Sequence, residues 1–187
     1  KIINFIDQLI LIVLVYIVIG LLTSIPFYLS NFQITFISSF FESISGLTGT
    51  GFSIFKNIKY LDPTLILWRS STQWIGGLYF LFSIIFLIDI YDENLKKSLT
   101  NFLSFNTTEV LKQTIKIFIL YSSLTLAIFI ILNLFGIRSF NSLNLAMTII
   151  SSGGFLPVND LSTILVQNSQ IIIFSLLMLV SFFSIFF

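Results

Sequence analysis

The chain has 187 residues, of which 56% are hydrophobic, 17% aromatic and only 9% charged, and its mean hydropathy is +1.04. A soluble globular domain carries about 25% charged residues. So few charges could not cover a water-facing surface, so the composition excludes a soluble protein and indicates an integral membrane protein. Its hydrophobicity excludes disorder, and nine Lys+Arg against eight Asp+Glu leave no basic face for nucleic acid.

The sequence contains neither histidine nor cysteine. Their absence excludes histidine-dependent triads, thiol chemistry, disulfides and zinc or haem sites. The chain starts at Lys1 and stops at Phe187 inside an apolar run, and no Ala-x-Ala site follows the first apolar run. We therefore expect a fragment of a longer protein, without a cleavable signal peptide.

The first apolar segment is too long for a single membrane span. No charged residue stands between Asp7 and Glu42, whereas a spanning helix needs about 20 residues. Pro26 and the polar residues after it suggest where this segment breaks. We predict a span over Gln8–Leu29, a turn, and a short helix from about Gln33 to Leu47.

A loop of glycines and small hydroxyl residues follows, from Leu47 to Ser53, and this composition favours extended or strained backbone over a helix. Pro63 then begins a second span, which we expect to end near Ile88. The polar segment 91–116 is predicted to be a water-exposed loop, and its lysines place it on the cytoplasmic side.

After this segment the same pattern starts again. Ile117–Phe135 is predicted to be a span, Phe140–Ile150 a short apolar helix, Ser151–Phe155 a small-residue loop, and Leu161–Phe187 a last span. The domain organisation expected is therefore a first unit over 1–90, a connecting loop over 91–116 and a second, truncated unit over 117–187.

The two units form an internal repeat with an offset of 103 residues, because Gly51 falls on Gly154 and Thr48 falls on Ser151. Each unit has a span, a short helix, a small-residue loop and a second span. The fold class predicted is an all-α integral membrane protein of repeated helix–pore helix–filter loop–helix units, similar to a potassium channel, with two units in this chain.

A short helix that ends in a Gly/Thr/Ser loop at bilayer depth is tolerated only inside protein or beside water. Rings of backbone carbonyls can replace the hydration shell of a potassium ion, and glycine permits the dihedral angles that aim successive carbonyls at one axis. The negative C-terminal end of the short helix would add to the attraction. A single loop of this kind favours simple close packing of helices, but two loops at equivalent positions favour a cation filter.

Three segments also carry a resemblance to a known family. Residues 41–51, Phe-Glu-Ser-Ile-Ser-Gly-Leu-Thr-Gly-Thr-Gly, resemble the first pore loop of the Trk/Ktr/HKT superfamily of potassium transporters. Residues 68–77, Trp-Arg-Ser-Ser-Thr-Gln-Trp-Ile-Gly-Gly, resemble the start of the next helix in the Trk membrane subunit, and residues 149–155 are similar to the second pore loop. The resemblance covers essentially the whole chain.

The resemblance implies four such units around one pore, with this chain holding the first two and the filter facing outward. It implies potassium uptake by a multi-pass protein of the cell (inner or plasma) membrane, in contact with lipid. A homodimer and a cytoplasmic nucleotide-binding ring protein that gates the pore are the expected partners. The potassium-binding filter positions that it implies are Thr48, Gly49, Thr50, Gly51, Ser151, Ser152, Gly153 and Gly154.

Two of these glycines matter in the comparison with the family. Gly51 and Gly154 match the family's key filter glycine, and a glycine at Gly51 favours potassium over sodium. Most members have threonine where Gly49 stands. Glycine at this position lacks that side chain but keeps the backbone carbonyl, so we expect the loop to be looser here.

Two charged residues fall within predicted membrane segments. Glu42 lies in the first short helix and Arg69 lies near the start of the following span. Ionisable residues at membrane depth are costly and usually paired, so we expect an ion pair that ties the pore helix to its outer helix. The alternative is that Arg69 extends toward the outer interface.

The leading hypothesis is a Trk-type potassium transporter that makes and breaks no bond. It is therefore not an enzyme, needs no cofactor and holds no metal other than potassium on its filter carbonyls. Two alternatives remain: a pore-like membrane assembly or sensor module without conduction, and a two-unit cation channel that works as a dimer. The sequence leaves open whether transport is coupled to protons or sodium.

Overall fold

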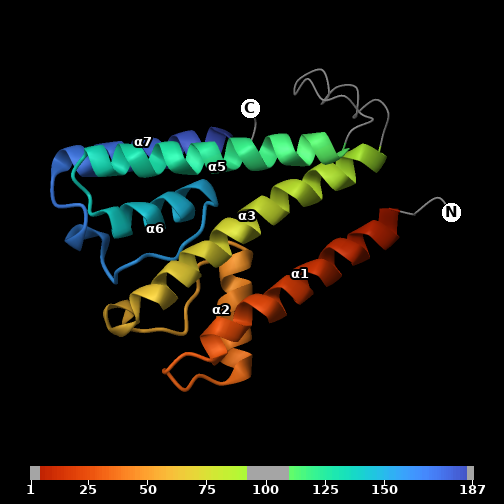
Figure 1. Ribbon diagram of the computed structural model, residues 1–187, viewed down its shortest axis with the longest axis horizontal. Coiled ribbons are helices and arrows are strands. Elements are labelled where there is room, and N and C mark those ends of the chain that lie inside the picture. Colours follow the sequence, from red (N-terminus) through yellow and green to blue (C-terminus); the bar gives the residue numbers. More distant parts are fainter. Residues whose placement is uncertain (1–4, 92–109, 185–187) are drawn as a thin grey trace.

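A computed structural model of the chain describes residues 5–91 and 110–184, and all regular elements in these residues are helical (Figure 1). The order is α1 (Phe5–Tyr28), α2 (Phe36–Leu47), η1 (Ile58–Tyr60), α3 (Pro63–Tyr91), α5 (Val110–Leu134), α6 (Ser139–Ile150), η2 (Leu161–Thr163) and α7 (Asn168–Ser184). Two long helices with a short helix between them occur in each half. The predicted fold class of repeated helix–pore helix–loop–helix units is confirmed.

The repeat is visible in the boundaries of the elements as well as in the sequence. The short helices α2 and α6 have 12 residues each, and their bounds differ by the same 103 positions. The single turns η1 and η2 have the same offset. The turns before the short helices match too, since Gln33 and Gly136 both have positive φ, 49° and 79°. Both units therefore follow one backbone plan between their long helices.

The boundary between the polar segment and the second unit differs from the prediction. Helix α5 begins at Val110 rather than Ile117. Lysine is a good helix former, so Lys112 and Lys116, both exposed, extend α5 beyond the apolar run. The rest of the predicted connecting loop, residues 92–109, lies outside the described residues.

The start of the last helix was predicted too early. Leu161–Thr163 is a single 3₁₀ turn capped by Asp160, whose carboxylate accepts a hydrogen bond from Ser162 N at 3.0 Å. Hydrogen bonding from the backbone and side chain of Ser162 lowers the pKa of the Asp160 carboxyl group. Helix α7 begins only at Asn168, and the Gln170 side chain accepts from Gln167 N at 3.1 Å just before it. Polar caps therefore separate two helices where hydropathy suggested one.

Two of the helices are long and apolar enough to cross a membrane by length and composition, over Ile6–Tyr28 in α1 and Lys112–Leu134 in α5. Their apolar side chains are mostly exposed, with 17% and 22% of these windows buried. Helix α3 has 29 residues but carries a polar stretch that includes Arg69 and Gln73. The apolar surfaces of α1 and α5 are those expected of helices that face lipid.

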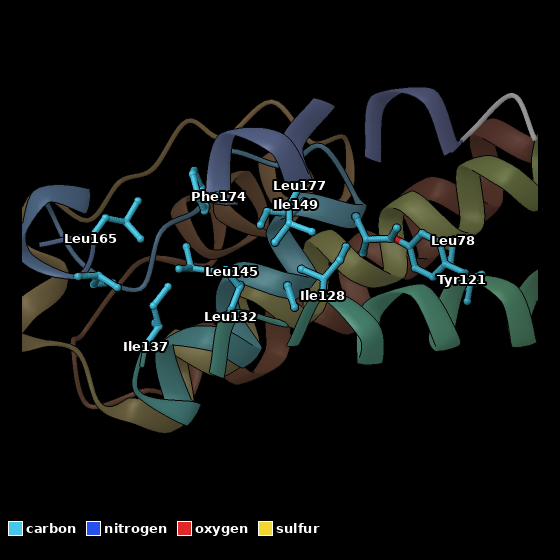
Figure 2. Close-up of a cluster of buried hydrophobic side chains, with 13 residues drawn as sticks. Leu78, Tyr121, Ile128, Leu132, Ile137, Leu145, Ile149, Leu165, Phe174 and Leu177 are labelled. Atoms are coloured by element: carbon cyan, nitrogen blue, oxygen red, sulfur yellow. The ribbon is translucent and has the colours of Figure 1, made fainter. Parts of the chain in front are cut away.

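Helix α3 lies at the centre of the fold (Figure 1). It packs against α1 and α2 of the first unit and against α5 and α6 of the second. Behind α6, buried side chains from α3, α5, α6 and α7 form the main apolar core, which includes Leu78, Ile128, Leu145 and Phe174 (Figure 2). This core supports the second short helix, and α3 reaches both small-residue loops.

Candidate functional site

The two small-residue loops meet in the structure. A Cβ added to Gly51 would lie 2.7 Å from Gly154 Cα, so the two predicted filter glycines are in backbone contact. A Cβ added to Gly49 would lie 3.7 Å from the carbonyl oxygen of Ser151 and 3.8 Å from that of Ser152. The second loop therefore turns two carbonyl oxygens toward the first loop.

The same hydroxyl-to-carbonyl bond closes each loop. Ser45, in the last turn of α2, donates from Oγ to Phe52 O at 2.6 Å. Thr148, at the equivalent place in α6, donates from Oγ1 to Phe155 O at 2.8 Å. A small hydroxyl residue in the short helix is thus the local reason that each loop turns back beside its own helix. Sequence reasoning did not single out Ser45 or Thr148.

Left-handed backbone recurs at the same loop position. Gly49 has φ 66° and its counterpart Ser152 has φ 51°, although serine pays a steric cost for this conformation that glycine does not. Gly51 has φ 75° as well. The conformation of the loop is therefore set by its place in the unit, and glycine is needed most where positive φ coincides with close backbone contact, at Gly51.

Within the described residues, the backbone carbonyls of the predicted filter positions in the two loops have no hydrogen-bond donors. In the part of the chain that the structure describes, no hydrogen bond reaches the carbonyl oxygens of these eight residues, Thr48, Gly49, Thr50, Gly51, Ser151, Ser152, Gly153 and Gly154. Unpaired backbone carbonyls are costly away from water. Unbonded carbonyls in two loops that meet can serve as oxygen ligands for a dehydrated cation.

The carbonyls at the end of the first pore helix are, in contrast, occupied. Ser45 O accepts from Thr50 N at 3.1 Å, and Leu47 O accepts from the Tyr16 hydroxyl at 2.8 Å. The end of α2 can therefore act on a cation through its dipole, while direct oxygen ligands would have to come from the loop.

The structure brings Glu42 and Arg69 together behind the first loop. Arg69 Nε donates to Glu42 Oε1 at 2.9 Å, and the two side chains are 1% and 0% exposed. Glu42 also accepts from Ser53 Oγ at 2.9 Å and from Ile54 N at 2.8 Å, and these two bonds fix the chain just after the predicted filter residues. Arg69 is therefore buried inside the fold rather than extended to its surface.

Arg69 also reaches the second loop. Its Nη1 donates to Leu156 O at 3.4 Å, and its guanidinium carbon lies 4.2 Å from the centre of the Phe155 ring. A cation over an aromatic face in a desolvated place contributes about 2 kcal/mol. One side chain of α3 therefore ties both loops to the same helix.

Gln73, one helical turn after Arg69, holds the second loop directly. With its amide oriented so that each atom meets a complementary partner, Oε1 accepts from Gly154 N at 2.8 Å and from Phe155 N at 2.7 Å, and Nε2 donates to Thr148 Oγ1 at 3.1 Å. The Thr148 hydroxyl, which already donates to a carbonyl, is then the acceptor. Sequence reasoning missed this role, although the spacing of four residues from Arg69 places both on one helix face.

Two glycines allow α3 to approach the ends of the pore helices. A Cβ at Gly76 would lie 2.0 Å from Leu47 O, and a Cβ at Gly77 would lie 2.6 Å from the Tyr121 hydroxyl and 3.0 Å from Ser151 Cβ. Neither glycine has positive φ in the structure, so each is needed for space rather than for backbone freedom. In the Gly-Gly pair that helps to carry the family resemblance, Gly76 thus packs against the first unit and Gly77 against the second.

Comparison with known proteins gives one consistent group of relatives. The chain is 28% identical over 167 residues to an uncharacterized cation transporter of Methanocaldococcus jannaschii. This alignment covers 81% of this chain and 34% of the relative. It is 25% identical over 158 residues to the Trk system potassium uptake protein TrkH of Vibrio parahaemolyticus, covering 80% of this chain and 32% of the relative. The chain thus spans about a third of the length of these two curated relatives.

The structural comparison agrees. The crystal structure of the potassium transporter TrkH from Vibrio parahaemolyticus matches with a TM-score of 0.64 and 25% identity, over 82% of this chain and 31% of that chain. No protein-family model matches the chain. The resemblance inferred from the pore-loop strings is confirmed by both the sequence relatives and the fold.

Proposed function

We propose that this chain, a relative of the Trk system potassium uptake proteins, supplies two pore units of a multi-pass membrane transporter that takes up potassium ions. The observation that carries the proposal is the pair of facing loops whose eight carbonyl oxygens accept no hydrogen bond within the described residues. Their oxygens would replace part of the hydration shell of potassium. The names and folds of the relatives support the same substrate.

The loops are proposed to act through backbone oxygens, with Thr48 to Gly51 on one side and Ser151 to Gly154 on the other. The helix dipoles of α2 and α6 would add negative potential at the ion without a carboxylate ligand. Passage of this kind makes and breaks no covalent bond, so the proposal includes no catalytic residue and no cofactor. We place the protein in the cell membrane, and a homodimer and a cytoplasmic ring partner remain part of the proposal from the family resemblance.

The test is potassium-dependent growth of bacteria that lack their own potassium uptake systems. The complete protein, with its ring partner, is expressed as wild type and as Gly51→Ser, and rubidium uptake is measured alongside growth. Wild type should rescue growth at low potassium and Gly51→Ser should not, because its Cβ would meet the Gly154 backbone at 2.7 Å where φ is 75°.

Gly136→Ser is the matched control. Gly136 also has positive φ, 79°, but a Cβ there would meet only the Gln170 side chain, at 4.0 Å, in the turn between α5 and α6. It carries the same backbone strain away from the loops, so it should still support growth. Wild type that reaches the membrane with its partner but does not rescue growth would contradict potassium uptake and favour a sensor or assembly module. Equal rescue by wild type and Gly51→Ser would contradict the assignment of Gly51 to the filter.

A further inference from the structure

Gln73 occupies an unusual position for a buried amide. It is 1% exposed, it belongs to the outer helix of the first unit, and all three of its hydrogen bonds go to the second unit. Two of those bonds are to consecutive backbone N–H groups of the second loop, those of Gly154 and Phe155. A single side-chain oxygen therefore fixes two neighbouring peptide planes.

The direction of a trans peptide couples its two polar groups. The described part of the chain has no cis peptide, so the C=O of each residue points opposite to the N–H of the next. Because the N–H groups of Gly154 and Phe155 point at Gln73 Oε1, the carbonyls of Gly153 and Gly154 must point away from α3. These are two of the eight carbonyls that accept no hydrogen bond.

The first loop lacks this arrangement. Its equivalent amide, Gly51 N, reaches only Ser45 O, at 3.5 Å, and the buried carboxylate of Glu42 bonds further along, at Ile54 N. The equivalent of Gln73 on α7 is Leu176, which is apolar and 51% exposed. Within the described residues, the double amide bond from Gln73 is therefore found at the second loop and has no counterpart at the first.

We propose that Gln73 is a positioning residue for ion selection, because it holds the Gly153 and Gly154 carbonyls toward the ion path. This inference rests on the proposed function. Without the acceptor oxygen, both peptide planes can rotate and their N–H groups can turn toward the path. A filter whose carbonyls are less fixed binds potassium more weakly and discriminates less against sodium.

The test uses the complete protein in potassium-uptake-deficient bacteria, with ion uptake measured over a range of potassium and sodium concentrations. Gln73→Met keeps the length of the side chain and removes the acceptor. It should raise the KM for potassium and lower the potassium-to-sodium preference, each by about tenfold, as expected when buried donors lose their acceptor. Gln73→Glu keeps an acceptor oxygen in either ionisation state and should restore most of the preference.

Ser70→Ala is the matched control for a general loss of packing. Ser70 is also 1% exposed on α3 and bonds α6 through Asn144 Oδ1 at 2.7 Å, but neither of its side-chain hydrogen bonds, to Asn144 and Ile66, goes to the loop. It should leave the preference for potassium unchanged. As a second measurement, the rise in melting temperature that potassium gives over choline in detergent should shrink in Gln73→Met and persist in Ser70→Ala.

The outcomes separate this inference from the function on which it rests. Unchanged preference and potassium-dependent melting in Gln73→Met would overturn the role of Gln73 while leaving potassium uptake intact. An equal loss in Ser70→Ala would overturn it as well, because packing alone would then explain the effect. Absence of potassium uptake by the wild type would reject the proposed function, and this inference with it.

Discussion

The first and second pore units share a backbone and differ in what holds it. In both, the short helix has the same length, a hydroxyl of its last turn bonds the same loop carbonyl, and the residue one position after the helix cap is left-handed. Behind the first loop stands a buried ion pair, Glu42 with Arg69. The counterpart of Glu42 in the second unit is Leu145, which is fully buried in the apolar core (Figure 2).

This difference shows which parts of a unit set the loop and which parts only support it. The turn from helix to loop is local, since it depends on bonds within about seven residues. The support for both loops comes from the long helix α3, where Arg69 bonds Glu42 behind the first loop and Gln73 bonds the second loop. On α7 the matching positions, Ile172 and Leu176, are apolar and 60% and 51% exposed. The polar supports of both described loops thus lie on the helix between them.

The largest expected effect comes from leaving one charge of the first unit unpaired. Arg69→Ile, which copies the residue at the equivalent place on α7, should destabilise the protein by about 3–5 kcal/mol because Glu42 then remains buried without its cation. This loss is measured by unfolding the purified complete protein in detergent, either by heating or by titration with a denaturant.

The double variant Glu42→Leu with Arg69→Ile gives the first unit the apolar pair of the second. It should be more stable than Arg69→Ile alone, since removing both partners leaves no uncompensated buried charge. A double variant as unstable as the single one would mean that the bonds to Ser53, Ile54 and Leu156 matter more than the charge. Glu42→Gln should fall between wild type and Arg69→Ile.

The next effect compares two neighbouring glycines that face different units. Gly76→Ala places a methyl group 2.0 Å from a backbone oxygen, Leu47 O, which cannot move without shifting α2. Gly77→Ala first meets the Tyr121 hydroxyl, the far end of a side chain, which donates to Trp74 O at 3.2 Å. Overpacking of this kind costs about 1–3 kcal/mol, so we expect Gly76→Ala near the upper value and Gly77→Ala near the lower.

Gly20→Ala provides the reference for this pair. Its Cβ would lie 2.4 Å from Ile44 Cδ1, the end of a flexible side chain on α2. Melting temperatures of the three variants should rank Gly20→Ala as the mildest and Gly76→Ala as the most severe. If Gly77→Ala proves more harmful than Gly76→Ala, the second loop is packed more tightly on α3 than the first.

Much of this architecture could be predicted from the sequence because it is local and repeated. The charge-free segments, the short helices and the offset of 103 residues all follow from hydropathy and glycine placement, and burial at membrane depth was enough to suggest the Glu42–Arg69 pair. The start of α7 was predicted too early, because the 3₁₀ turn over Leu161–Thr163 and its cap at Asp160 depend on side-chain-to-backbone bonds that a hydropathy pattern does not report. The role of Gln73 was hidden because its partners lie about 80 positions away and two of the three are backbone N–H groups, which leave no mark in a residue pattern.

The smallest expected effect concerns the left-handed position shared by the loops. Gly49 has φ 66° with no atom closer than 3.7 Å to an added Cβ, and Ser152 already has a side chain in that conformation at φ 51°. Exchanging the two, as Gly49→Ser and Ser152→Gly, should therefore change stability by only about 1 kcal/mol in opposite directions. Both variants should support growth at low potassium, unlike Gly51→Ser. Loss of uptake in Gly49→Ser would mean that the room beside Gly49, rather than the shared backbone of the two loops, sets the function of the first.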